Sequence, residues 1–506
     1  MSVCFIGVDL GTSGIKAGLM NESGKIIART YWDTTLIASQ PGQMEQDPDF
    51  FYKKTVQIIK ETTEKSGVDA NNIAGITIAG QMGGIIGVDK DFNSVTGLDM
   101  GLDIRSEKYN AELHKKHGKQ ITTTTFGSPR NTPKIMMWAR EHRKTYSKVE
   151  KFVTLSGYVS AKLAGLKSDD AFIDYTLLTF FGNEDAEKLC WSEELTATFG
   201  LDIKKFPRVV NPWDIIGNLT AEPAKLAGLK QGTPIIAGAG DQPAGFLGAG
   251  FVEPNKLLDV SGSTTLLFAN VNSFSPDTKN HTVMFMPSVI KGSYTAFTYI
   301  NGGGITLKWF CDEFAPGSSL DSLVNGAKKI PPGSGGLLFI PYFGGRQCPY
   351  NAEVRGAWIG LNWGHKKEYL FRAILEGLTF DYTLSLEHIR NSFPEIDTSS
   401  ITGIGGGTKS NFWNRIKADV LNIPYLIPEE NQFTLRGCGI ITGYAVGVYN
   451  DLQTTAKQFS LHDKKQTIQP DKKNTALYKP FYSAFKKALQ SPLIETMQKI
   501  STIKQQ

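Results

Sequence analysis

The order of hydrophobic and polar positions at the amino terminus predicts short strands joined by tight turns. Clusters of Gly, Ser, Thr and Asn separate three apolar runs rich in strand-forming residues. These runs are residues 4–9, 15–20 and 25–30. Residues 48–66 instead have apolar positions at helical spacing behind Asp47, a candidate N-cap, and residues 73–80 form a further apolar run. Strands that alternate with helices indicate an α/β layered fold with ligand-binding loops at strand ends.

A similar pattern begins again near residue 235. An apolar strand over 234–239 ends at Gly-Asp-Gln, and a helix is expected over 243–250. Strands over 256–260 and 265–270 flank a Ser-Gly-Ser-Thr turn, which repeats the first hairpin. We therefore predict two α/β domains related by duplication, residues 1–245 and residues 246–506.

The carboxyl-terminal part continues this alternation. A strand over 401–404 breaks into three glycines, and a helix is expected from Asn411 to Leu421. From Leu477 onward, aromatic and aliphatic residues at helical spacing predict a terminal helix.

Composition narrows the class of protein. The 506 residues are 41% hydrophobic and 20% charged, which is typical of a soluble globular chain of more than one domain. No run approaches the roughly 18–20 apolar residues that span a bilayer, and the start lacks the basic region of a signal peptide, so we expect a cytoplasmic protein without membrane contact. The net charge of +5 is spread without a basic block and does not indicate nucleic acid. The five scattered cysteines predict buried, reduced thiols rather than disulfides or a zinc site.

The first turn carries candidate phosphate chemistry. Gly11, Thr12, Ser13 and Gly14 offer successive backbone N–H groups and two hydroxyls, which together can form an anion-binding nest. Asp9, just before the turn, is placed to hold Mg²⁺ through water. An ordinary hairpin turn is the alternative interpretation.

The second turn has the same composition over residues 261–265. Two such turns on separate domains indicate a polyphosphate held between them. A P-loop is absent from the sequence, and the glycines at 238 and 240 lead to Pro243, where a dinucleotide-binding fingerprint needs glycine.

Five motifs in order resemble the FGGY family of carbohydrate kinases. They are DLGTSGIK at 9–16, GQM at 80–82, GDQPAG at 240–245, DVSGSTT at 259–265 and GGGTKSNFWNRIKAD at 405–419. A stretch from Gly356 to Glu376 resembles the second family signature, with Tyr369 in place of a polar or acidic residue.

This resemblance implies two actin-like (ribonuclease H-like) domains around a cleft for ATP, Mg²⁺ and sugar. It implies that residues 1–245 bind the sugar and residues 246–506 bind the nucleotide. It also implies that Asp241 is the catalytic residue and that Asp9 serves the metal. We expect ATP to contact the two turns and the glycine-rich stretches, at Gly11, Thr12, Ser13, Lys16, Gly262, Ser263, Thr264, Gly303, Gly406, Gly407 and Asn411.

The position of Asp241 supports a catalytic role independently. It ends an apolar strand and precedes a predicted helix, where α/β sheets present ligand-binding groups. Phosphoryl transfer to an alcohol passes through a loose transition state, so a carboxylate that orients the hydroxyl and accepts its proton late is sufficient. The alternative is that Asp241 only caps the helix.

The sugar site departs from the family pattern. We expect the sugar to contact Gln81, Met82, Asp103, Arg105, Asp241 and Gln242. Gly83 stands where pentulose kinases of this family usually have His, and Gly101 where they usually have Trp. Loss of a hydrogen-bonding and a stacking group should alter specificity. A surface Asp–Arg pair is the alternative for Asp103 and Arg105.

The sequence therefore predicts ATP-dependent phosphorylation of a terminal hydroxyl of a small sugar, first of all a ketopentose such as xylulose. Gluconate, another ketose or a polyol are alternatives, as is a non-catalytic, ATP-binding sugar sensor. A homodimer is implied by the family alone.

Overall fold

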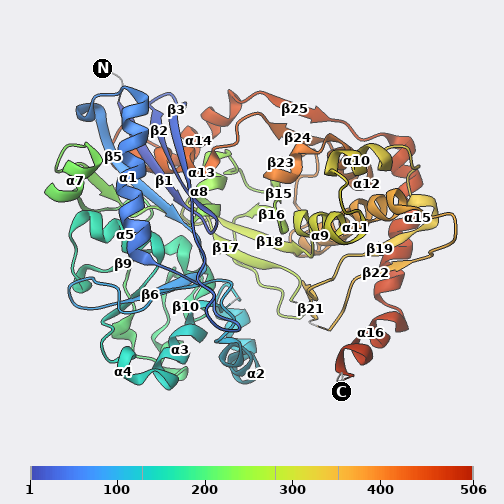
Figure 1. Ribbon diagram of the computed structural model, residues 1–506, viewed down its shortest axis with the longest axis horizontal. Helices are drawn as coiled ribbons and strands as arrows, with labels where there is room; N and C mark the ends of the chain where they lie inside the picture. Colours follow the sequence, from blue (N-terminus) through green and yellow to red (C-terminus); the bar gives the residue numbers. More distant parts are fainter. Residues whose placement is uncertain (1–2, 128, 280, 352, 504–506) are drawn as a thin grey trace.

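Two twisted sheets organise the chain (Figure 1). The computed structural model describes residues 3–127, 129–279, 281–351 and 353–503. The first sheet has the strand order β13-β14-β5-β1-β2-β3. Its strands are β1 (Cys4–Leu10), β2 (Gly14–Asn21), β3 (Ile26–Asp33), β5 (Ile73–Gly80), β13 (Ile215–Asn218) and β14 (Pro234–Ile236). β1 pairs antiparallel with β2 and parallel with β5, so its carboxyl end meets that of β5 at one edge.

The second sheet repeats this arrangement. Its order is β17-β18-β16-β15-β23-β24-β25. The strands are β15 (Leu257–Ser261), β16 (Thr265–Val271), β17 (Met284–Pro287), β18 (Tyr294–Ile300), β23 (Ile401–Ile404), β24 (Tyr425–Pro428) and β25 (Lys465–Ile468). β15 pairs antiparallel with β16 and parallel with β23, as β1 does with β2 and β5. The predicted repeat of the first hairpin is confirmed.

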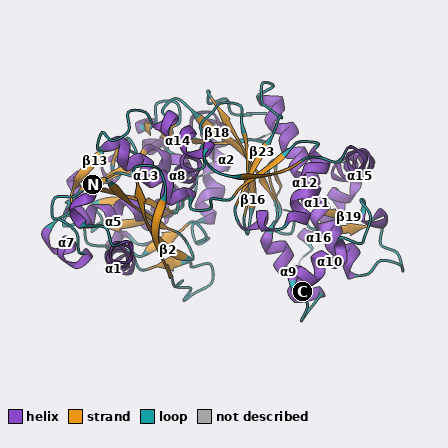
Figure 2. Ribbon diagram, turned by 90° about the horizontal axis from the view of Figure 1, so that it is seen from above, coloured by secondary structure: helices purple, strands orange, loops and turns teal. Residues whose placement is uncertain are grey.

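Alternating residues of β1 face two different layers of helices. Ile6 and Val8 join the core formed with α1 (Pro48–Ser66) and α5 (Leu155–Ala164). Phe5 faces the other layer, which includes α13 (Phe433–Ala445), and a β-carbon on Gly7 would lie 2.8 Å from Cys438 Cβ of α13. α13 packs on α8 (Asp241–Gly248), and both lie between the two sheets in Figures 1 and 2. A helix from late in the chain thus completes the core of the first sheet.

A smaller sheet extends the first domain, in the order β4-β7-β6-β8. Its strands are β4 (Glu45–Gln46), β6 (Gly84–Val88), β7 (Leu98–Met100) and β8 (Lys151–Val153), and the neighbouring helices are α2 (Glu107–Thr124), α3 (Asn131–Glu141) and α4 (Arg143–Tyr146). These strands are short, and the sequence pattern did not predict them as a sheet.

The second sheet is covered by helices at the far side of the molecule (Figure 1). They are α9 (Gly304–Phe314), α10 (Leu320–Ala327), α11 (Lys367–Ser392), α12 (Asn411–Leu421) and α15 (Lys472–Leu489), and α16 (Pro492–Thr502) follows α15. In contrast, α14 (Leu452–Leu461) packs on α8 and α13 and contributes to the core beside the first sheet. The remaining elements are α6 (Glu193–Thr198), α7 (Ala221–Ala227), β9 (Phe172–Asp174), β10 (Glu184–Asp185), β11 (Cys190–Trp191), β12 (Arg208–Val210), β19 (Leu338–Ile340), β20 (Arg346–Gln347), β21 (Tyr350–Asn351) and β22 (Ala357–Ile359).

Most sequence expectations agree with these elements. The helix behind Asp47 is α1, and the Asp47 side chain accepts a hydrogen bond from Asp49 N–H. The strand predicted over 234–239 ends at Ile236, because the Gly238 N–H donates to Pro212 O outside the sheet. The helix expected from Pro243 begins at Asp241. All five cysteines are free thiols, as predicted, but only Cys4, Cys348 and Cys438 are buried, whereas Cys190 and Cys311 are partly exposed. Within the described ranges, no helix combines the length and apolarity needed to cross a membrane.

Candidate active site

The first predicted phosphate turn joins β1 to β2. Gly11 N–H donates to Gly14 O at 3.0 Å and closes the turn, with Ser13 exposed at its tip. Asp9 lies near the end of β1 opposite Lys16, and the Lys16 Nζ is 3.5 Å from its carboxylate. Burial raises the pKa of Asp9, although Lys16 acts in the opposite direction. A second cation near Asp9 would further stabilise the ionised form of this buried carboxylate.

Gln81 joins this turn to the predicted sugar site. Its Oε1 accepts from Thr12 Oγ1 at 3.2 Å, and its Nε2 donates to Gln46 Oε1 at 3.0 Å. Gln46 in turn donates through Nε2 to Thr12 O at 3.0 Å. The end of β5 and the first phosphate turn are therefore fixed to each other. Gln46 was missed by the sequence analysis, because its contact depends on the small sheet.

Asp241 is the first residue of α8, and Gly240 is the N-cap. Gly240 bridges to Gly80 at the end of β5, and Met82 packs against it. The Asp241 Oδ1 accepts from Gln242 N–H at 2.8 Å. Burial and then the charge of Asp9 raise the pKa of Asp241 to about 7. Asp241 is therefore not the N-cap residue itself, although its carboxylate accepts from an N–H of the first turn of α8, and the charge of Asp9 also acts on it.

A buried pair of residues supports the loop before Asp241. Gly240 N–H donates to Thr176 Oγ1 at 2.8 Å, and the Thr176 hydroxyl donates to the Asp174 carboxylate. Asp174 is buried, which raises its pKa to about 7. The surrounding sequence carries no motif that could have revealed this contact.

The second predicted phosphate turn is surrounded by glycine-rich chain. Gly304 N–H donates to Gly262 O at 3.0 Å, and Ile305 N–H donates to Ser263 O at 3.1 Å. Gly303 has a φ of 128°, and a β-carbon there would lie 2.5 Å from Thr265 Oγ1. A β-carbon on Gly405 would lie 2.5 Å from Ser261 O.

The other predicted nucleotide residues follow directly. Gly406 is exposed, and a β-carbon added there would meet no atom within 4 Å, whereas Gly407 packs on Ser261. Asn411 is exposed at the start of α12. The structure thus brings together the second turn and the stretches at 302–304 and 405–407, with an open face at Gly406.

A buried ion pair lies beneath this second turn. Lys417 Nζ is 2.6 Å from Asp259 Oδ2, and both side chains are at most 1% exposed. Lys417 also donates to Ser261 Oγ, and Tyr382 OH donates to Asp259 Oδ1 at 2.5 Å. Burial lowers the pKa of Lys417, and Asp259 acts in the opposite direction. Lys417 lies inside a recognised motif, but its partner is 158 residues away and could not be inferred.

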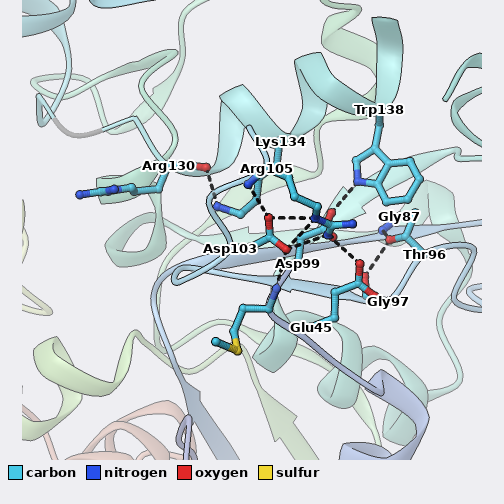
Figure 3. Close-up of polar contacts among 11 residues, drawn as sticks. Glu45, Gly87, Thr96, Gly97, Asp99, Asp103, Arg105, Arg130, Lys134 and Trp138 are labelled. Atoms are coloured by element: carbon cyan, nitrogen blue, oxygen red, sulfur yellow. Dashed lines mark hydrogen bonds and ion pairs between the residues drawn. The ribbon is translucent and has the colours of Figure 1, made fainter. Parts of the chain in front are cut away.

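Asp103 and Arg105 form part of a polar cluster beside the small sheet (Figure 3). Arg105 Nη2 lies 2.6 Å from Glu45, 2.8 Å from Asp99 and 2.7 Å from Asp103. Trp138 donates to the second oxygen of Asp99. Carboxylate oxygens of the three acids lie within 4.8 Å of one another, and the guanidinium takes the place that a cation would need.

The Asp103 side chain is fully buried in this cluster. Its oxygens accept from Arg105 Nε and from Met44 N–H, the latter at 2.8 Å. Burial raises the pKa of Asp99 to about 7 and lowers that of the nearby Lys134 to about 8. The Asp–Arg pair anticipated as an alternative exists, but it is buried and shared with two more acids.

The two unusual glycines of the predicted sugar site lie against each other. Gly101 N–H donates to Gly83 O at 3.1 Å. A β-carbon on Gly83 would lie 3.0 Å from Gly101 Cα, and one on Gly101 would lie 3.4 Å from Gly83 Cα. Each replacement therefore makes room for the backbone of the other.

Comparisons with known proteins agree with this geometry. Residues 4–248 match the N-terminal domain of the FGGY family of carbohydrate kinases, and residues 260–446 match its C-terminal domain. The chain is 29% identical to a xylulose kinase of Bacillus subtilis (strain 168), over 94% of this chain and 96% of that one. It is 25% identical to a gluconokinase of the same organism, over 97% of each. The crystal structure of a gluconate kinase from Lactobacillus acidophilus matches the fold with a TM-score of 0.88 at 23% identity, over 97% of this chain and 98% of that one.

Proposed function

Because the chain belongs to the FGGY family of carbohydrate kinases, we propose that it phosphorylates a terminal hydroxyl of a ketopentose such as xylulose. The observation that carries this proposal is that Asp241 follows the bridge between Gly240 and Gly80 at the end of β5, near enough to Asp9 for the Asp9 charge to raise the Asp241 pKa. Xylulose kinases among the relatives favour this substrate over the others.

Asp241 would act as the proton acceptor. Its carboxylate has a raised pKa and is fixed at the start of α8 by Gly240, which Thr176 holds in turn. A sugar hydroxyl that donates to Asp241 would be oriented toward the phosphoryl group, and its proton would pass to Asp241 late in the transfer. Gln81 and Met82 would line the same pocket and Gln242 its edge. Asp103 and Arg105 would shape the pocket from behind, since their charges are already paired.

The residues present fit a magnesium nucleotide. The charge of Asp9 raises the pKa of Asp241, and among the residues described Lys16 is the cation paired with Asp9. Mg²⁺ prefers one or two carboxylates together with waters and phosphate oxygens, and when bound it would neutralise charge on the phosphates.

The two turns would hold the polyphosphate from opposite sides. Backbone N–H groups of the first turn, with the Thr12 and Ser13 hydroxyls, would take one end. Gly262, Ser263 and Thr264 would take the other, with Gly303, Gly406, Gly407 and Asn411 along the nucleotide. Lys16, half-exposed beside Asp9, would contact a phosphate oxygen.

A second substrate class has one observation in its favour. Gly83 and Gly101 remove side chains that a pentulose pocket of this family usually has, and a gluconokinase is also among the relatives. Gluconate, a larger ketose or a polyol could use that space. A non-catalytic sugar sensor is disfavoured. Binding of ATP and sugar does not by itself require a carboxylate such as that of Asp241 near Asp9 and the end of β5.

The test is ADP release from Mg-ATP, measured by a coupled assay against xylulose, ribulose, sedoheptulose, gluconate and erythritol. We expect xylulose to give the highest kcat/KM. A higher kcat/KM for gluconate or for a polyol would overturn the ketopentose as the substrate but would still support a carbohydrate kinase. ATP binding without turnover on any sugar would favour the sensor. A cytoplasmic location and a homodimer stay predictions.

A further inference from the structure

A cavity of about 360 Å³ lies in the second domain, away from the residues discussed so far. It opens between α11, α15 and the β20–β21 hairpin, on the side of the molecule where the chain ends (Figure 1). At roughly 30 Å³ per water this volume would hold about a dozen waters, which is more than a bare inorganic ion fills. Its walls include the side chains of Arg346, Leu384, His388, Asn391, Lys486 and Leu489.

Two residues that line this cavity each have one buried polar atom without a hydrogen-bond partner in the described part of the chain. Arg346 Nε and His388 Nε2 are both shielded from solvent, and within the described part of the chain neither makes a hydrogen bond. Such groups are costly when they stay unsatisfied, so a native structure that keeps them usually has a use for them. Arg346 stacks on Tyr342, with its guanidinium carbon 5.4 Å from the ring centre, which fixes its plane.

Among the residues described, Arg346 makes no ion pair, although the charge of the buried Asp381 acts on it. Lys486 is paired with Glu387 at 2.7 Å, and Asp277 accepts from the Thr282 hydroxyl at 2.6 Å. Burial, and next the charge of Arg346, lowers the pKa of His388 to about 4, so its imidazole is neutral and can donate one N–H. Leu384 and Leu489 supply apolar wall for a carbon skeleton.

The cavity is connected to the second phosphate turn by short contacts. Gln347, next to Arg346, donates from its N–H to Asn301 Oδ1 at 3.2 Å. Asn301 N–H donates to Asp381, which also accepts from Tyr342 OH at 2.8 Å. Three residues later, Gly304 N–H donates to Gly262 O in the phosphate turn. A displacement of Arg346 could therefore be transmitted through Gln347 and the segment 301–304 to the second phosphate turn.

We propose that this cavity is a regulatory site for a small organic anion, a phosphorylated or carboxylated metabolite, whose anionic group binds the Arg346 guanidinium beside His388. A planar guanidinium suits both phosphate and carboxylate, because it can donate two parallel hydrogen bonds to either. Occupancy would then change nucleotide affinity through Gln347 and Asn301. This inference does not depend on which sugar is phosphorylated.

The test is isothermal titration of the full chain, saturated with Mg-ADP, with fructose 6-phosphate, citrate and inorganic phosphate. We expect fructose 6-phosphate or citrate to bind with a dissociation constant below about 1 mM, and which of the two binds identifies the anionic group. Arg346→Met should weaken this binding roughly 10–100-fold. The matched control, Arg390→Met at an exposed position of α11, should leave it unchanged.

A second titration measures Mg-ADP affinity with and without the bound anion. We expect a change of at least about fivefold in either direction, with the same factor in the affinity for the anion. Arg346→Lys keeps the positive charge but loses the two parallel N–H donors of the guanidinium. If Arg346→Met does not fold, Arg346→Lys replaces it in both titrations, with Arg390→Lys as its control. The proposal is overturned if no organic anion binds, if inorganic phosphate binds equally well, if Arg346→Met binds as the wild type does, or if Mg-ADP affinity does not change.

Discussion

The Lys417 ammonium lies 2.6 Å from the Asp259 carboxylate, and the pair is closed off from solvent directly beneath the second phosphate turn. Asp259 belongs to β15 and Lys417 to α12, and both contact Ser261, where the turn begins. Because a buried charge without its partner is costly, this pair fixes the position of the turn relative to α12.

Lys417→Met should therefore destabilise the protein by about 3–5 kcal/mol, measured as the free energy of unfolding in urea. The double variant Lys417→Met with Asp259→Asn should lose less than Lys417→Met alone, because it leaves no unpaired charge. Affinity for Mg-ADP should fall in the single variant. A loss of stability below about 1 kcal/mol would show that the pair has little influence on this region.

Gly303→Ala should weaken nucleotide binding. Its φ of 128° disfavours any side chain, and the added β-carbon would press on Thr265 and on the phosphate turn. We expect the dissociation constant of Mg-ADP to rise at least about tenfold, equal to about 1.4 kcal/mol. Gly317→Ala is the matched control, since Gly317 also has a positive φ of 77° but no atom within 4 Å of its β-carbon position. Equal effects of both variants would assign the loss to backbone strain alone.

Gly83→His and Gly101→Trp should each lower the free energy of unfolding by about 1–3 kcal/mol, because each new side chain meets the backbone of the other glycine. Their effects on unfolding should not add, since the two residues are in contact. We also expect Gly83→His to lower kcat/KM most for the bulkiest accepted substrate. Simple additivity, with an unchanged order of substrates, would contradict the view that this pair sets the width of the pocket.

Asp241→Asn should change the pH dependence of stability. In the folded protein the pKa of Asp241 is raised from 3.8 to about 7, so ionisation is disfavoured by folding. The wild type therefore loses stability from this group as pH rises from about 4 to 7, whereas the variant does not. After allowance for partial exposure, the free energy of unfolding of the variant should rise relative to that of the wild type by about 2 kcal/mol between pH 4 and pH 7, without added Mg²⁺.

The matched control for this pH effect is Asp91→Asn, which removes a carboxylate from an exposed pair with Lys167. Its stability relative to the wild type should stay nearly constant over the same pH range, because surface pairs contribute little. Unfolding in urea at pH 4, 5.5 and 7 measures both variants. A flat difference for Asp241→Asn would mean that Asp241 is ionised at no cost.

Much of the layout could be predicted from the sequence because local pattern decides it. The Gly/Ser/Thr turns, α1 behind Asp47, β5, β23 and α12 follow from periodicity and capping. The pairing of Lys417 with Asp259 could not be predicted, because it joins residues 158 positions apart through tertiary packing.

The contacts of the predicted sugar-binding residues could not be predicted from the sequence either. Asp103 and Arg105 were identified by motif, but the shared contacts with Glu45 and Asp99 depend on a sheet of very short strands that no periodicity reveals. Likewise, the departures at Gly83 and Gly101 were visible in the sequence as two separate losses. Only the structure shows that they are one contact.

The most direct test of the account compares wild type and Asp241→Asn in sugar-dependent ADP release, with Mg-ADP affinity measured on the same samples. Asp241 is proposed to touch the reacting hydroxyl but not the nucleotide. We therefore expect turnover to fall by about 10²–10⁴-fold while the dissociation constant of Mg-ADP stays within a few-fold. Turnover near that of the wild type in Asp241→Asn would contradict the central claim.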